Sequence, residues 1–350
     1  MTEDTRSPSV SRPFSDRSFG RLADALGPLL GLVVVIAFFA LADYWQGNQK
    51  FFTVHNLHTR SVEAAATGVA ALGMTAVIIS GGIDLSAGTA LALSATVLAY
   101  CLRENYPPAV AVLAGLGTGC LAGFVNGALI SLLRVVPFIV TLGTMSVYLG
   151  VAKFVADETT IHLLREQAPR WLSGSGLMNT RPRPEWLADG WIPHLLPNFA
   201  SGVWLALALA VLLSLVLKRT VFGRYIFAIG SNEATARLCG INVPLMKIAI
   251  YTLSGLFVGI GGLYQFSRTS VGTPTSGIGL ELRIIAAVVL GGTSLKGGRG
   301  LVLGTLAGAA MITAIESGCD QLGLPNLTRD IVIGAIIVAA AALDQWRQRE

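Results

Sequence analysis

The chain has 350 residues, of which 53% are hydrophobic and only 13% are charged. A soluble domain carries about 25% charged residues, so this composition indicates a membrane protein with many spans. The formal net charge is +5, but no basic stripe with interleaved aromatic residues accompanies it, which argues against a nucleic-acid partner.

The apolar runs are long and do not alternate, so they predict transmembrane helices rather than the alternating strands of a β-barrel. The first run exceeds a signal peptide and lacks a small-residue cleavage site, so we expect it to stay as a helix. The expected fold is an all-α polytopic membrane protein with about ten spans, some of them broken, near 22–44, 62–80, 86–102, 109–133, 137–155, 201–218, 247–267, 282–295, 300–318 and 329–345. The eighth span is too short to cross about 30 Å of hydrocarbon at about 1.5 Å per residue.

A single transmembrane domain, 22–345, is therefore expected between short tails at 1–21 and 346–350. Lys and Arg are more frequent in the segments that lie inside when the N-terminus is cytoplasmic. Both termini are then cytoplasmic, because positive residues favour the inner face. The same topology gives a long outer loop at 156–200 and a cytoplasmic loop at 219–246.

One short pattern, G-G-x-x-L-x-x-G, occurs twice, beginning with Gly81-Gly82 and again with Gly291-Gly292. Each glycine costs a helix about 1 kcal/mol relative to alanine, so both places predict helix breaks. Matching breaks in two halves of a hydrophobic chain point to a transport path. Both copies follow a span that runs inward, which favours a parallel repeat, with the first copy expected nearer the cytoplasm.

Glycines also recur every four residues along three of the predicted spans. Such stripes let helix backbones approach closely within a membrane. We interpret them as contacts inside one subunit, with a subunit interface as the alternative. They are Gly115, Gly119, Gly123 and Gly127, then Gly255 and Gly259, then Gly300, Gly304 and Gly308.

Asp84 follows the first glycine pair, where a carboxylate is costly unless it has a partner. Asp84 and Ser86 could cap the next helix at its positive end, or they could form a polar gate beside the path. A proton relay lacks a second carboxylate. Asn126 could contact a polar solute or a neighbouring helix. The remaining candidates for the path or gate are Phe138, Thr141 and Thr293.

The cytoplasmic loop contains a predicted short helix of about two turns within 230–241. Ser231 or Asn232 can cap it, Glu233 stands in its first turn, and Gly240 can end it. Its apolar face, formed by Ala234, Leu238 and Ile241, is expected to enter a partner's groove. The alternative is that this helix lies among lipid headgroups.

The sequence shows no site that uses energy or performs catalysis. The G-x-x-x-x-G-K-[ST] phosphate loop is absent, because Lys296 is followed by two glycines. No catalytic triad, pair of catalytic carboxylates or cluster of metal ligands is visible. We therefore expect a transport subunit, not an enzyme, with no metal site and no cofactor of its own.

Four stretches, 73–86, 137–145, 230–241 and 285–295, resemble the membrane permeases of bacterial ABC importers for monosaccharides, the ribose/xylose/galactose type. The likeness runs in collinear order over about 50–345 and implies a type II-like ABC importer permease. Branched-chain amino-acid permeases fit 81–86 less well. Ala87 and Thr89 depart mildly from the pattern, and the loop 156–200 does not match it.

The resemblance implies a homodimer in the bacterial inner membrane, a periplasmic sugar-binding protein outside, and an ABC ATPase that uses ATP and Mg on the cytoplasmic face. The ATPase would dock on a coupling helix formed by Gly230, Asn232, Glu233, Ala234, Leu238, Gly240 and Ile241. Three alternatives stay open: an ABC permease for a nucleoside, polyol or branched-chain amino acid, an ion-coupled secondary transporter, and a membrane-embedded enzyme.

Overall fold

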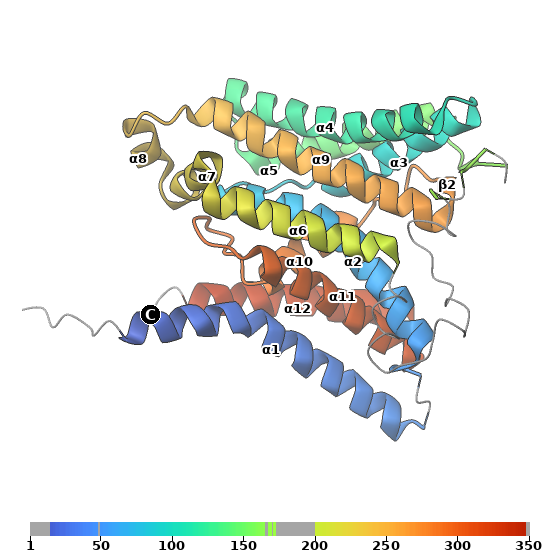
Figure 1. The fold of residues 1–350 in the computed structure, drawn as a ribbon, viewed down its shortest axis with the longest axis horizontal. Coiled ribbons are helices and arrows are strands. Elements are labelled where there is room, and N and C mark those ends of the chain that lie inside the picture. The colour runs from blue at the N-terminus through green and yellow to red at the C-terminus, as the bar shows by residue number, and fades with distance from the viewer. Residues whose placement is uncertain (1–14, 48–49, 165–166, 170, 173–199, 348–350) are drawn as a thin grey trace, which may run out of the picture.

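The computed structural model describes residues 15–47, 50–164, 167–169, 171–172 and 200–347. Within them the chain is a bundle of helices with one small two-stranded sheet (Figure 1). The helices are α1 (Ser15–Trp45), α2 (Val54–Ile79), α3 (Ala87–Arg103), α4 (Pro108–Leu133), α5 (Pro137–Val155), α6 (Ser201–Arg219), α7 (Val221–Ser231), α8 (Glu233–Leu238), α9 (Val243–Thr269), α10 (Leu280–Leu290), α11 (Val302–Gln321) and α12 (Asn326–Arg347). The strands are β1 (Ile161–His162) and β2 (Val271–Gly272), which pair antiparallel.

Each predicted span overlaps one helix, although the eighth was predicted to 295 and α10 ends at Leu290, and the all-α polytopic class is confirmed. Seven helices in the described part of the chain are long and apolar enough to cross a membrane. Two others are short, with 17 residues in α3 and 11 in α10. The second helix begins at Val54, well before the predicted 62. The full count of about ten spans stays a prediction.

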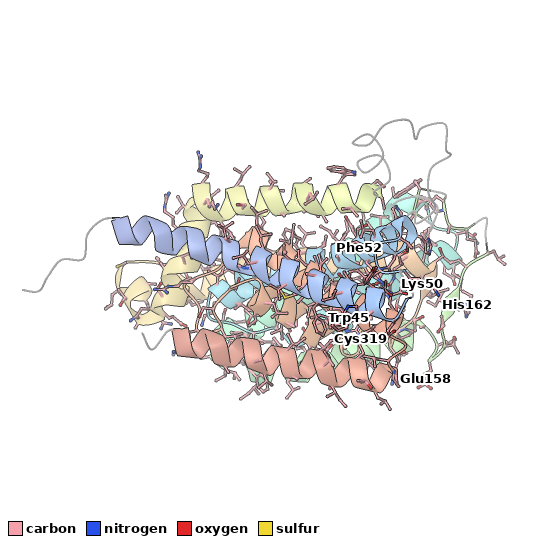
Figure 2. All side chains as sticks on the ribbon, turned by 90° about the horizontal axis from the view of Figure 1, so that it is seen from below. Trp45, Lys50, Phe52, Glu158, His162 and Cys319 are labelled. Atoms are coloured by element: carbon pink, nitrogen blue, oxygen red, sulfur yellow. The ribbon has the colours of Figure 1, made fainter. Side chains whose placement is uncertain are left out.

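The helices run back and forth between two ends of the bundle (Figure 1). The start of α1, the end of α12 and the helices α7 and α8 lie at one end, called here the α8 end. The small sheet lies at the opposite end, the β2 end. Figure 2 shows Lys50, Glu158 and His162 at the β2 end as well. The bundle therefore places both ends of the described chain beside the predicted coupling loop.

The helices α2 and α11 are the most deeply buried, whereas α4, α5 and α6 expose much of their apolar surface. Most of the α5–α6 loop, which was predicted to lie outside, is not among the described residues.

The glycine stripes lie where helices of this one chain touch. A Cβ on Gly119 would lie 2.6 Å from the Gly255 oxygen, and one on Gly123 would overlap the Tyr251 oxygen. On the third stripe, a Cβ on Gly308 would overlap the Ala287 oxygen. These stripes thus bring α4 against α9 and α11 against α10, which is the interpretation preferred from the sequence.

Candidate functional site

The first glycine pair ends α2 with two closing hydrogen bonds. The Gly81 amide donates to the Ile78 oxygen at 2.9 Å, and the Gly82 amide donates to the Val77 oxygen at 3.0 Å. Gly81 has φ +82°, a left-handed conformation that glycine adopts without steric cost. The chain then leaves the helix and re-enters one at α3.

The second glycine pair ends α10 in the same way. The amides of Gly292 and Thr293 donate to the oxygens of Val289 and Val288, at 2.9 and 3.2 Å. Here the left-handed residue is Gly292, with φ +81°. The structural counterpart of Gly81 is therefore Gly292 and not Gly291. The left-handed glycine is the first of the pair in the first copy of the sequence pattern and the second of the pair in the second copy. The pattern of closing hydrogen bonds, and not the position in the sequence pattern, decides which glycine is left-handed.

The two loops meet each other and α7 at the α8 end. The Gly298 amide donates to the Ile79 oxygen at 2.8 Å, which satisfies a terminal carbonyl of α2. A Cβ on Gly297 would lie 3.0 Å from the Gly81 Cα, and a Cβ on Gly230 would overlap the Ile79 oxygen. We call Gly81, Gly230, Gly297 and Gly298 the glycine junction. The two loops are thus in contact, and the predicted difference in their depth in the membrane stays a prediction.

A buried polar cluster lies behind the first loop. Asp84 Oδ1 accepts from the Ser86 amide at 2.9 Å and from Ser86 Oγ at 2.6 Å. Asn126 Nδ2 donates to Ser86 Oγ at 2.7 Å and lies 3.4 Å from Asp84 Oδ1. Tyr148 Oη donates to Asn126 Oδ1 at 3.1 Å. All four residues are buried, so the cluster ties the loop to α4 and α5.

These contacts favour a structural role for Asp84. Ser86 occupies the N-cap position of α3, but its side chain makes no capping hydrogen bond, so that part of the capping prediction is wrong. Asp84 instead turns the chain toward α3. The hydroxyls of Thr141 and Tyr251 also reach the loop and donate to the Ile83 oxygen at 3.3 and 3.4 Å.

The other predicted path residues do not join this cluster. Phe138 is 47% exposed on the outside of α5. Thr293 is buried in the second loop, and its hydroxyl has no hydrogen-bond partner among the described residues. Sequence reasoning missed Tyr148 and Tyr251. Their signal was available, because a tyrosine inside an apolar span needs a partner for its hydroxyl.

The predicted coupling segment is two helices and not one. Gly230 belongs to α7, and the chain breaks at Asn232 before α8 begins. Asn232 Oδ1 accepts from the Thr235 amide at 2.9 Å, and Gly240 has φ +83° after the helix ends. The cap and the stop are those predicted, but α8 has only 6 residues because Gly230 is held in the junction.

The surface of α8 combines an ion-pair anchor with an exposed apolar tip. Glu233 pairs with Arg237 at 3.2 Å and with Lys247 at 2.8 Å, which fixes α8 to the start of α9. Leu238 is 88% exposed, and Ala234 and Gly240 are exposed too. Ile241 is half-buried against a small apolar cluster, so the free face is narrower than predicted.

Comparison with known proteins decides the family. Residues 57–341 match the model of the branched-chain amino acid transport system permease component. The chain belongs to this family. It is 36% identical to a ribose import permease of Bacillus subtilis, over 93% of this chain and 94% of that protein. It is 34% identical to a fructose import permease of Rhizobium meliloti (90% and 84% covered) and 35% identical to a probable ABC transporter permease of Escherichia coli (89% and 87%).

No solved structure matches the chain. These relatives confirm the resemblance to sugar-importer permeases that the sequence motifs indicated. Like them, the chain is a transport subunit of an ABC importer, and ATP hydrolysis belongs to a separate chain.

Proposed function

We propose that this chain forms the translocation path of an ATP-driven importer that carries a monosaccharide across a bacterial inner membrane. Relatives named for fructose and for ribose, with coverage of most of both chains, support a sugar as the substrate. The description of the matching family names branched-chain amino acid transport, so a branched-chain amino acid is the second candidate substrate.

One observation carries the mechanism, namely the glycine junction. Through it, a displacement of α7 presses on the end of α2 and on the loop after α10 at the same time. No side chain separates these backbones, so the contact is stiff. Since both loops end a helix that runs in from the β2 end, moving α7 would tilt both halves of the path together.

The exposed tip of α8 is the proposed docking point of the ABC ATPase. Leu238 and Ala234 form a small exposed apolar surface that would enter a groove of the ATPase. The ion pair between Glu233 and Lys247 would transmit a movement of α8 to α9. ATP and Mg would act in the ATPase, and this chain would need no cofactor. In this arrangement the α8 end is cytoplasmic, with both ends of the described chain beside it.

The remaining partners follow from the same proposal. A second copy of the chain would complete the path, and a periplasmic sugar-binding protein would dock at the β2 end. The domain 22–345 would act as one unit between the tails 1–21 and 346–350. An ion-coupled mechanism has less support, because Asp84 and Glu316 are each paired within the chain.

The test is a charge placed on the tip of α8. Leu238→Asp and Ala234→Glu should abolish sugar uptake and release the ATPase on copurification, while the permease still inserts in the membrane. Lys218→Glu, on the exposed end of α6 at the same end of the bundle, is the matched control and should keep both properties. Wild-type uptake in both tip variants would refute the proposed docking point.

A further inference from the structure

A polar cavity opens at the β2 end, remote from the junction and from α8. It has a volume of about 320 Å³ and is lined by α2, α9, α10, α11 and α12, with one leucine from α3. The cavity extends about 10 Å along α2, because Arg60 and Thr67 both line it and each residue adds about 1.5 Å to the helix. Figure 2 places Cys319, the residue before Asp320 of the lining, at this end of the bundle.

Ion pairs form a chain along part of the cavity. Glu63 pairs with Arg60 at 2.9 Å and with Arg268 at 3.4 Å. Asp320 pairs with Arg60 at 3.0 Å and with Arg329 at 3.5 Å. Four helices, α2, α9, α11 and α12, are therefore linked through this chain of ion pairs.

A separate ion pair lies between α10 and α11. Arg283 Nη1 lies 2.9 Å from Glu316 Oε1, and the glutamate side chain is only 10% exposed. That contact does not have the geometry of a hydrogen bond, and the buried Nε of Arg329 also has no hydrogen-bond partner among the described residues. A guanidinium has five N–H donors and a carboxylate about four acceptor sites. The lining therefore holds more donors and acceptors than its ion pairs use.

We propose that this cavity binds a neutral, polyhydroxylated molecule, which, if the proposed function holds, is a monosaccharide on its way into the path. Each hydroxyl both donates and accepts, so a sugar can satisfy the carboxylates and the guanidinium groups together. The charges of the lining already pair with one another. A neutral polyol can use the donors and acceptors that these ion pairs leave free without separating any pair. The volume lies within the range of about 300–1,000 Å³ that small-molecule pockets span.

The cavity also opposes an amino acid with a branched apolar side chain. Its lining adds neutral polar groups, Thr67, Gln265 and Thr313, to the charged ones. An apolar side chain would have to desolvate these groups without bonding to them, which disfavours binding. The lining also holds apolar residues, among them Leu280 and Ile284, so the preference for a sugar over a branched-chain amino acid rests on the charged and neutral polar groups.

The experiment is saturation-transfer NMR with the purified full-length permease in nanodiscs, using D-ribose, D-fructose and L-leucine as probes. The sugars should show a saturable signal and leucine none. Glu316→Gln should weaken sugar binding by about tenfold, because a hydrogen bond to a charged acceptor is lost. Gln265→Ala should weaken sugar binding by about fivefold. Gln265 is only half-buried, so this variant is expected to fold like the wild type.

Glu104→Gln is the matched control, since Glu104 forms an ion pair with Arg103 at 3.2 Å outside the cavity. Sugar binding that is absent, equal in all variants, or weaker than leucine binding would overturn the cavity proposal. Uptake of the same sugars by the complete importer is measured in parallel. Wild-type uptake without variant-sensitive binding refutes the cavity alone, whereas no uptake of either sugar refutes the proposed function.

Discussion

Adding one methyl group at Gly230 should disconnect the proposed docking helices from the path. The new Cβ of Gly230→Ala would overlap the Ile79 oxygen and lie 2.6 Å from the Gly298 amide nitrogen. Both are backbone atoms, so no side chain can rotate away. Either α7 or the loop after α10 must move, and the hydrogen bond from Gly298 to Ile79 is then strained or lost.

The expected cost can be divided into two parts. Overpacking of this kind costs about 1–3 kcal/mol, and the lost hydrogen bond adds about 1 kcal/mol. Alanine in place of glycine inside α7 returns about 1 kcal/mol of helix propensity. The net destabilisation is then about 1–3 kcal/mol, which is small enough for the protein to fold but concentrated at the junction.

The assay is ATP-dependent sugar uptake together with ATP hydrolysis, measured on the complete importer. Gly230→Ala should reduce uptake by at least tenfold and leave ATPase binding intact. Gly143→Ala is the control, because it gains the same helix propensity and its new Cβ meets nothing within 4 Å. If Gly230→Ala transports like Gly143→Ala, the junction does not couple the two parts of the molecule.

Three further substitutions test separate contacts. Asp84→Ala should cost about 2 kcal/mol or more in a detergent unfolding titration, because the amide and the hydroxyl of Ser86 both lose their acceptor; an unchanged midpoint would contradict the structural role. Tyr148→Phe should cost about 1 kcal/mol in the same titration, and an unchanged or raised midpoint would show that the hydrogen bond of its hydroxyl does not stabilise the fold. Asn232→Ala should cost α8 about 1 kcal/mol and raise amide exchange there, while exchange in the membrane helices stays at the wild-type rate; uniform exchange would argue against a local cap.

The helices and the two breaks were predictable, because hydropathy and paired glycines act locally. The ends of α8 were predictable for the same reason, since Asn232 and Gly240 have strong positional preferences. The G-G-x-x-L-x-x-G pattern placed the second turn one residue too early, because the sequence does not reveal which glycine of a pair adopts the left-handed conformation at the helix end.

Contacts between distant segments could not be predicted. Gly230 and Ile79 are far apart in sequence, and only the packed bundle brings them together. The same holds for Arg283 and Glu316. Each of these residues has an ordinary local explanation, as a helix residue or as a polar group near a span end. Their shared role follows from three-dimensional packing.

The central claim is that ATP hydrolysis in a partner drives sugar through this chain. Its most direct measurement is uptake of D-ribose and D-fructose into vesicles that contain the permease and its ATPase, with the binding protein outside. The account predicts that uptake of at least one sugar requires ATP, persists in the presence of a protonophore, and disappears in Leu238→Asp. Uptake that survives removal of the ATPase and collapses with the protonophore would contradict it.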